Sequence, residues 1–542
     1  MTRPTGASAL LAIACLLPPP GASSALPSPG VQTAGGDALA VHVLNRLAYG
    51  PRPGDLEELR RVGVDRWIER QLRPEGIEDR ALETRLAALR TVGLSSAELL
   101  EGYEVPREVK REAQEKRAAL GDDATEAQRE QAKRELRARA RALMDGSPRE
   151  VVEELQAAKL LRAVYGERQL DEVMADFWLN HFNVYAGKGP VKFLLAEYER
   201  DVIRRHAWGR FEDLLRATAQ SPAMLFYLDN WLSADPEGGA PTVAGRVRSL
   251  FGRPPAPAPA GRRRGLNENY AREIMELHTL GVDGGYTQKD VTEVARAFTG
   301  WTIAGLRQQK PAFRFEPRLH AGGDKVVLGQ RIRSGGKGEG EQVLHMLATH
   351  PSTARFISYK LARRFVADEP PAALVDRAAR VFRETDGRIR DVVRAIVTSP
   401  EFRAPDAVQA KVKTPLEFVA SALRASGAEL QDARALSRRL GEMGMGLYMQ
   451  QPPTGYKDTA EAWVSTSGLL ARLNLALDLA AGRVPGVRLP STLATGAPET
   501  LAARLVPGGL GQSTRQTLAR EAAAEPARVA GLLLGSPEFQ RR

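Results

Sequence analysis

The chain has almost no cysteine and no later stretch long and apolar enough to span a membrane. Cys15 is the only cysteine among 542 residues, and it lies within the first 25. Cleavage after Ala25 would remove it, which excludes disulfides and cysteine-ligated metals from the rest of the chain. The apolar run from Ala7 to Leu17 is 11 residues long, well below the roughly 20 that a membrane-spanning helix needs. The sequence therefore predicts a soluble protein held together by its apolar core.

The motifs of several large enzyme classes are also missing. The sequence contains no HExxH, no GxSxG, no GxxxxGK[ST] and no GxGxxG between a strand and a helix. Simple zinc proteases, serine hydrolases of the elbow type, P-loop enzymes and dinucleotide-binding enzymes are therefore excluded. What reaction the protein performs, if any, is not indicated by any of these patterns.

The first 25 residues have the layout of a signal peptide. Arg3 precedes the apolar run, and three prolines and a small-residue stretch ending at Ala25 follow it. We expect residues 1–25 to be removed on export, residues 26–36 to form a disordered lead, and the mature chain to be periplasmic or secreted. Lipid anchoring at Cys15 is the less favoured alternative, because apolar residues and prolines follow that cysteine.

The chain is basic, with a formal net charge of +11. Such a charge favours acidic partners, here an anionic component of the cell envelope or another exported protein. A general bias towards arginine and alanine explains the same charge without any partner. Nucleic acid is an unsuitable partner, because export separates the chain from it and the dense run 262–264 has no interleaved aromatic residues.

Helical spacing of apolar residues begins at Ala40, Val43, Leu44 and Leu47 and recurs along most of the chain, which predicts a large, mainly α, multi-helix protein. We expect two helical regions, residues 37–232 and 266–542, that form one compact unit, with a Pro/Gly-rich linker or loop at 233–265 between them. The first region should carry an inserted, solvated and charged helical hairpin at residues 104–145, and the second a small β-hairpin at residues 313–332.

Residues 267–301 predict a helix, a loop and a second helix, and the first helix carries a carboxylate stripe. At 100° per residue, Asn269, Glu273 and Glu276 share one face, and His278 lies on the far side. Two glutamates beside an asparagine suit a divalent metal or acid/base catalysis. The alternative is a plain ion-pair ladder, since Arg272 lies four residues before Glu276.

Two histidines complete the set of candidate catalytic or metal-binding residues. His181 ends a segment in which aromatic residues three and four positions earlier predict an apolar setting. His320 and Asp324 belong to a predicted loop and could both face a site. A structural role is the alternative for each histidine, and the enzymatic hypothesis requires His181, Glu273 and His320 to lie close together.

At these segments the sequence resembles the secreted bacterial proteins catalogued as domain of unknown function number 1800. The resemblance implies a helical, exported protein without an assigned activity. One position departs from the family pattern, because Ala321 follows His320 where the family has aspartate; a metal site carried over from the family would need Asp324 in its place. The stretches that carry the resemblance are residues 176–183, 222–230, 267–301, 320–329, 350–368, 413–423 and 453–474.

The sequence thus supports two hypotheses. The first is a non-catalytic envelope protein that binds a partner or assists its assembly or export, which fits the missing motifs and the basic charge. The second is a periplasmic or extracellular enzyme whose site lies between the helices of His181 and Glu273 and the loop of His320, with or without a bound metal.

Overall fold

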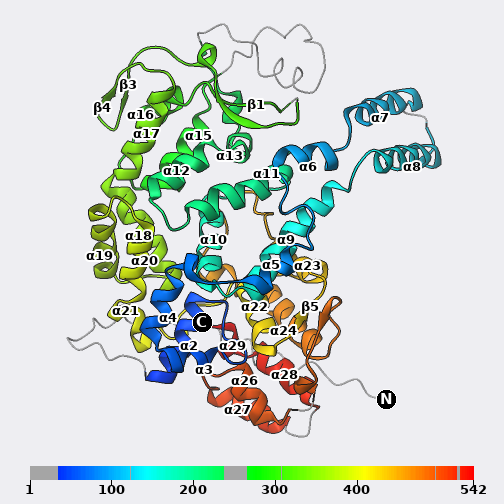
Figure 1. Cartoon of the computed structure of the whole chain (residues 1–542), viewed down its shortest axis with the longest axis vertical. Coiled ribbons are helices and arrows are strands. Elements are labelled where there is room, and N and C mark those ends of the chain that lie inside the picture. The colour runs from blue at the N-terminus through cyan, green and yellow to red at the C-terminus, as the bar shows by residue number, and fades with distance from the viewer. Residues whose placement is uncertain (1–34, 122–123, 237–264, 307, 495, 522–524) are drawn as a thin grey trace.

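The computed structural model describes residues 35–121, 124–236, 265–306, 308–494, 496–521 and 525–542. The predicted signal peptide and most of the predicted linker at 233–265 lie outside these residues. Helices dominate the described chain and strands form three small two-stranded sheets, which confirms the mainly α fold class (Figure 1). Within the described chain, no helix combines the length and the apolar character required to cross a membrane.

The N-terminal region begins with short helices that pack near α9 and α10. Its elements are α2 (Gly36–Leu47), α3 (Asp55–Val62), α4 (Val64–Gln71), η2 (Pro74–Gly76), α5 (Arg80–Leu86), α6 (Ser96–Tyr103), α7 (Arg107–Leu120), α8 (Glu126–Ala142), α9 (Pro148–Tyr165), α10 (Gln169–His181), α11 (Val191–Glu197), η3 (Tyr198–Arg204), α12 (Phe211–Gln220), α13 (Pro222–Tyr227) and η4 (Asn230–Leu232).

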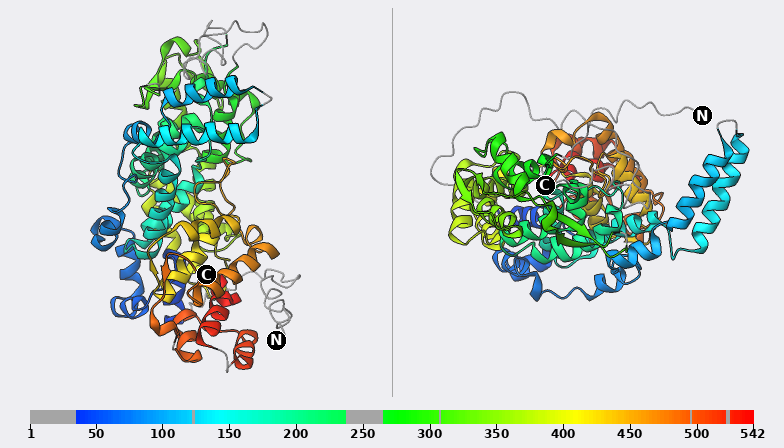
Figure 2. Two further views of the ribbon diagram at one scale, coloured as in Figure 1. Left: turned by 90° about the vertical axis from the view of Figure 1, so that its right-hand side faces the viewer. Right: turned by 90° about the horizontal axis from the view of Figure 1, so that it is seen from above.

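Helices α7 and α8 form the predicted charged hairpin, which projects from the body of the protein as an arm (Figures 1 and 2). Helix α8 has no buried residue, in keeping with a sequence rich in arginine, glutamate and alanine. The base of the arm is closed by a backbone hydrogen bond of 2.8 Å from Asp145 N to Gly102 O.

The middle of the chain combines a helix pair with two of the small sheets. Its elements are α15 (Glu268–Glu273), η5 (Ile274–Leu280), α16 (Gln288–Ala297), β1 (Trp301–Ala304), β2 (Ala312–Phe315), η6 (Pro317–Leu319), β3 (Lys325–Val327) and β4 (Gln330–Ile332). The predicted strands near 313 and 326 are both present as β2 and β3, but they do not pair with each other. Strand β2 pairs with β1 and β3 pairs with β4, both antiparallel, because each has a closer partner along the chain.

The remaining helices form the wall and the base of the molecule in Figure 1. Their elements are α17 (Lys337–Thr349), α18 (Pro351–Phe365), α19 (Ala372–Glu384), α20 (Ile389–Val397), α21 (Pro400–Arg403), η7 (Pro405–Ala407), α22 (Pro415–Ser426), β5 (Glu429–Leu430), α23 (Arg434–Glu442), η8 (Ala460–Ala462), α24 (Thr466–Ala480), β6 (Val487–Arg488), α25 (Ser491–Ala494), α26 (Pro498–Leu505), α27 (Gln512–Arg520), α28 (Pro526–Gly535) and α29 (Pro537–Gln540).

Side-chain caps fix the starts of several helices. Ser221, Ser399 and Ser536 each precede a proline, and each accepts a backbone hydrogen bond from the first turn of the helix that follows. Thr287 and Asp290 form a capping box at the start of α16. These caps need only local sequence, which explains why they can be predicted.

Buried arginines join segments that are far apart in the sequence. The Arg46 Nη2 atom donates to the carbonyl of Ala407 at 2.6 Å, and Arg424 Nε donates to the carbonyl of Gly50 at 2.7 Å. Helix α10 lies among these elements and is buried along almost its whole length. Its few polar side chains therefore face either protein groups or the cavities described below.

Candidate functional site

The two candidate glutamates do not lie on a regular α-helix. The segment that follows Glu273 is π-helical from Ile274 to Leu280, so the reading of 100° per residue is wrong beyond Glu273. Glu276 accepts a hydrogen bond of 2.8 Å from the Tyr286 hydroxyl. Glu273 is half-buried, and burial first, then the charge of Glu276, raises the pKa of its carboxyl. Among the described residues, neither glutamate forms an ion pair with Arg272, whose guanidinium donates to Gln288.

His320 and Asp324 point to different surroundings. The Nδ1 atom of His320 lies 2.8 Å from the carbonyl of Thr299, and its Nε2 atom lies 3.1 Å from Glu339 Oε1. Glu339 also forms an ion pair with Lys325, and the side chains of all three residues are buried. Asp324 instead pairs with Arg331 at the surface and accepts from the Ser334 amide. The loop therefore does not bring His320 and Asp324 to one site.

His181 lies in a third place, at the carboxyl end of the buried helix α10. Its Nε2 atom is 3.1 Å from the carbonyl oxygen of His278, which can only accept a hydrogen bond, so this nitrogen carries the proton. The Nδ1 atom therefore accepts, and Lys360 Nζ lies 2.8 Å from it. Burial, then the charge of Lys360, lowers the pKa of His181 well below its usual range, so the ring is neutral.

His181 and Lys360 line a cavity of about 190 Å³ between α10, α18 and a loop spanning 445–458. We call it the Lys360 cavity. Its volume exceeds what one water molecule requires, so it can hold a small molecule. Its lining residues are Asp176, Phe177, Asn180, His181, Lys360, Arg363, Arg364, Thr414, Met445, Thr454, Tyr456, Lys457 and Asp458.

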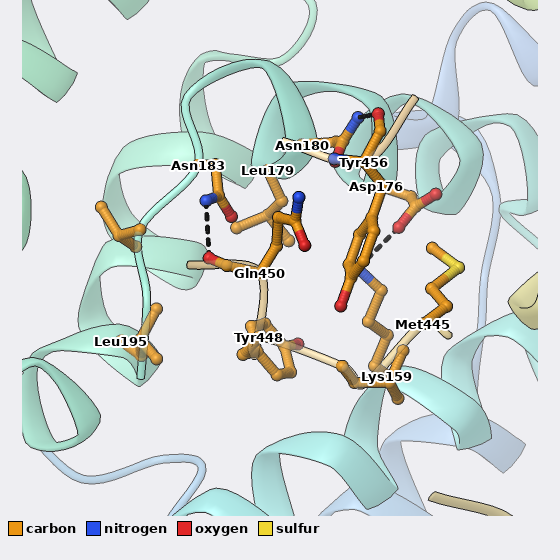
Figure 3. A pocket seen from close by; sticks show the side chains of 12 residues that line it. Lys159, Asp176, Leu179, Asn180, Asn183, Leu195, Met445, Tyr448, Gln450 and Tyr456 are labelled. Carbon is orange, nitrogen blue, oxygen red and sulfur yellow. Dashed lines mark hydrogen bonds and ion pairs between the residues drawn. The ribbon is translucent and has the colours of Figure 1, made fainter. Parts of the chain in front are cut away.

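A second, water-sized pocket adjoins the Lys360 cavity and shares Asp176, Asn180 and Tyr456 with it (Figure 3). Asn180 holds the loop in place, because its amide donates to Tyr456 O at 2.8 Å and its oxygen accepts from Tyr456 N at 2.7 Å. Asn183 likewise donates to the carbonyl of Gln450 at 2.9 Å. Gly455 of this loop packs directly against Asn180, and a Cβ atom at position 455 would lie 2.2 Å from the backbone carbonyl oxygen of Asn180. The asparagines of α10 thus position the loop that closes the cavity.

Lys360 is the unusual charge of this cavity. Among the described residues, no carboxylate oxygen lies within 4.0 Å of its Nζ atom. The carboxylates that line the cavity are committed elsewhere: Asp176 pairs with Lys159 at 2.6 Å, and Asp458 lies 3.5 Å from Lys411. Burial lowers the pKa of Lys360 to about 8, with Asp458 opposing and Arg363 reinforcing this effect.

Arg363 and Arg364 lie one helical turn after Lys360, and residues i, i+3 and i+4 share a helix face. The two arginines therefore add positive charge to the same wall of the cavity. Arg363 Nη2 pairs with Glu369 at 2.9 Å, outside the cavity. Arg364 is buried and uses Nη1 on Glu417 at 2.6 Å. Its Nε and Nη2 atoms are shielded from solvent and have no hydrogen-bond partner among the described residues. Lys457, whose side chain is 72% exposed, lies where the cavity meets the surface.

The arrangement differs from the site that the sequence predicts. His181, Glu273 and His320 lie in three separate environments, and within the described chain no group of three histidine, aspartate, glutamate or cysteine side chains is arranged to hold a metal ion. Both ring nitrogens of His181 already face protein groups. Of the predicted residues, only His181 lines the Lys360 cavity.

The sequence predictions omit Lys360, Arg363 and Arg364. A usable signal exists, since three cations at i, i+3 and i+4 on a helix with an apolar opposite face are unusual for a buried helix. The partners in the loop could not be found in this way, because they lie about a hundred residues further along the chain.

Residues 42–541, nearly the whole chain, match the family described as Protein of unknown function (DUF1800). The chain belongs to this family. Neither a curated protein nor a solved structure matches it. The DUF1800 match covers every residue of the Lys360 cavity, so the cavity lies within the part of the chain that defines the family.

Proposed function

We propose that the protein binds a small acidic molecule in the Lys360 cavity. The observation that carries this proposal is the Lys360 ammonium, which faces a neutral histidine and has no carboxylate within 4.0 Å among the described residues. Lys360 is partly buried, and a charge that is partly buried without a counter-charge is costly, a cost that a bound anion reduces.

The neighbouring arginine supports the same ligand class. Arg364 also lines the cavity, and the positive charge of its guanidinium favours an anion such as a carboxylate, phosphate or sulfate group there. Four basic residues line the cavity against two acidic ones, and both acidic residues lie close to cations outside it. Arg363, Arg364 and Lys457 also pair with glutamates outside the cavity, so Lys360 is the cation that a cationic or strongly apolar ligand would leave uncompensated.

Calorimetric titration with phosphate, sulfate, acetate and succinate tests the proposal. At pH 7 we expect at least one of them to bind the wild type, and Lys360→Met to weaken that binding by about 10- to 100-fold, since a hydrogen bond to a charged group contributes about 1.5–3 kcal/mol. Lys289→Met removes an equal charge from an exposed residue that does not line the cavity, and it should leave anion binding unchanged. Equal affinity of the wild type and Lys360→Met for every anion would refute the proposal.

The setting of this site is a second part of the proposal. We infer that the protein is exported and acts in the cell envelope as a binding protein, and the signal-like layout of residues 1–25 supports this. Intact mass of the protein recovered from the envelope fraction is the test. A mature chain starting near Leu26 agrees with it, and a chain that retains Cys15 with an added acyl mass would establish lipid anchoring instead.

A further inference from the structure

The Lys360 cavity raises the question of why its central cation is a lysine. An arginine would hold an anion equally well and would remain charged in a buried site. A lysine offers something that arginine does not, since its amine becomes a nucleophile when it loses a proton. The surroundings of Lys360 bear directly on this difference.

We infer that Lys360 is a nucleophilic amine that condenses with the carbonyl group of a small oxo acid held in this cavity. The inference rests on the proposed function, because the acid group of the same molecule would occupy the anion site. The ligand class is therefore a small carboxylic or phosphorylated acid that also carries an aldehyde or ketone.

The geometry around the amine supports this role. His181 Nδ1 accepts one N–H of Lys360 at 2.8 Å, and the tautomer of that ring is fixed by the His278 carbonyl, so the amine is held in one orientation. Its other side borders the cavity. No carboxylate within 4.0 Å among the described residues holds it as an ammonium ion.

Burial and the positive charge of Arg363 favour the neutral form of the amine, and Asp458 opposes them from beyond ion-pair distance. His181 and His278 are neutral and add no charge beside it. Asp458 in turn shares its charge with Lys411 and Arg542. A pKa of about 8 leaves a usable fraction of free amine at neutral pH.

The condensation needs no further reagent. The lone pair of Nζ attacks the carbonyl carbon, and the carbon–oxygen π bond breaks. The nitrogen loses two protons, the oxygen leaves with two protons as water, and a carbon–nitrogen double bond remains. No oxidation or reduction occurs, so the atoms and electrons balance with the amine and the oxo acid alone.

Pyridoxal 5′-phosphate is a suitable probe, because it carries both an aldehyde and a phosphate. The full-length protein is incubated with it at pH 8, reduced with borohydride and digested, and the modified lysines are identified by mass. We expect Lys360 to be labelled at least tenfold faster than Lys289, an exposed lysine elsewhere on the surface. An anion that binds by calorimetry should slow the labelling of Lys360 and leave that of Lys289 unchanged.

Lys360→Arg separates this inference from the proposed function. The variant keeps the positive charge and lacks the amine, so it should bind anions more tightly than Lys360→Met does and should lose the cavity label. Anion binding by the wild type together with labelling of Lys360 no faster than Lys289 would overturn the amine and leave the binding function standing. Loss of anion binding in Lys360→Met with unchanged circular dichroism would show that neither result reflects unfolding.

Discussion

Replacing Lys360 by methionine should change the pH dependence of stability in a calculable way. Methionine keeps most of the side-chain volume and removes the charge. The pKa of Lys360 is lowered from 10.5 in the unfolded chain to about 8 in the folded protein. Below pH 8 the lysine is charged in both states, and its folded state bears the full cost of burying that charge.

The size of the effect follows from the two pKa values. Each pKa unit corresponds to about 1.4 kcal/mol, so the lysine destabilises the folded protein by about 3 kcal/mol at pH 7. The penalty falls to about 1 kcal/mol at pH 9.5, where most folded molecules have lost this proton, and it vanishes above pH 10.5. The variant loses the hydrogen bond to His181 as well, but that loss is nearly the same at both pH values and cancels in the difference.

Urea denaturation of both proteins at pH 7 and pH 9.5, in a low-salt buffer without added oxyanions, measures the quantity directly. We expect the stability of Lys360→Met relative to the wild type to decrease by about 2 kcal/mol between the two pH values. Lys289→Met is the control and should show no such change. A difference between the variant and the wild type that does not depend on pH would mean that Lys360 has an ordinary pKa, and the reasoning about the cavity would fail.

Three further predictions concern other parts of the molecule. Glu339→Gln should lower the free energy of unfolding by about 3–5 kcal/mol in urea denaturation at pH 7, because it breaks a buried ion pair with Lys325. Glu341→Gln affects a more exposed pair with Lys337 and should lower it by less than about 1 kcal/mol. Equal losses would refute the assignment of the first pair as buried and charged. Glu273→Gln should leave the melting temperature unchanged at pH 4 and raise it at pH 8, because a carboxyl group with a raised pKa destabilises the folded state only where it is ionised. A lower melting temperature of the variant at pH 8 would instead indicate that Glu273 forms a stabilising ion pair. Replacing residues 104–144 by a short glycine–serine turn should shift the melting temperature by no more than about 2–4 °C, because the Asp145–Gly102 hydrogen bond already closes the base of the arm; a larger loss would show that the arm supports the core.

Features that depend on nearby residues could be predicted from the sequence. The charged hairpin follows from two helical stretches with few large apolar residues, and the Ser–Pro helix starts follow from cap chemistry. The apolar setting of His181 follows from aromatic residues one turn away on the same helix.

Features that depend on distant contacts or on irregular helices could not be predicted. The π-helical segment after Glu273 changes the direction of the side chains from Ile274 to Leu280, and the sequence of residues 267–280 contains no pattern that predicts it. The strands β2 and β3 were recognisable, but their partners were not. The Lys360 cavity combines α10, α18, Thr414 and the 445–458 loop, which only the folded chain brings together.

The Lys360 cavity as an anion site is the central claim, and a crystal soaked in selenate at pH 6.5 tests it most directly. Selenium gives an anomalous signal, so the position of the anion can be found without assumptions about the ligand. We expect a peak within hydrogen-bond distance of Lys360 Nζ in the wild type and no peak there in Lys360→Met. Peaks confined to surface arginines, with only water beside Lys360, would contradict the claim.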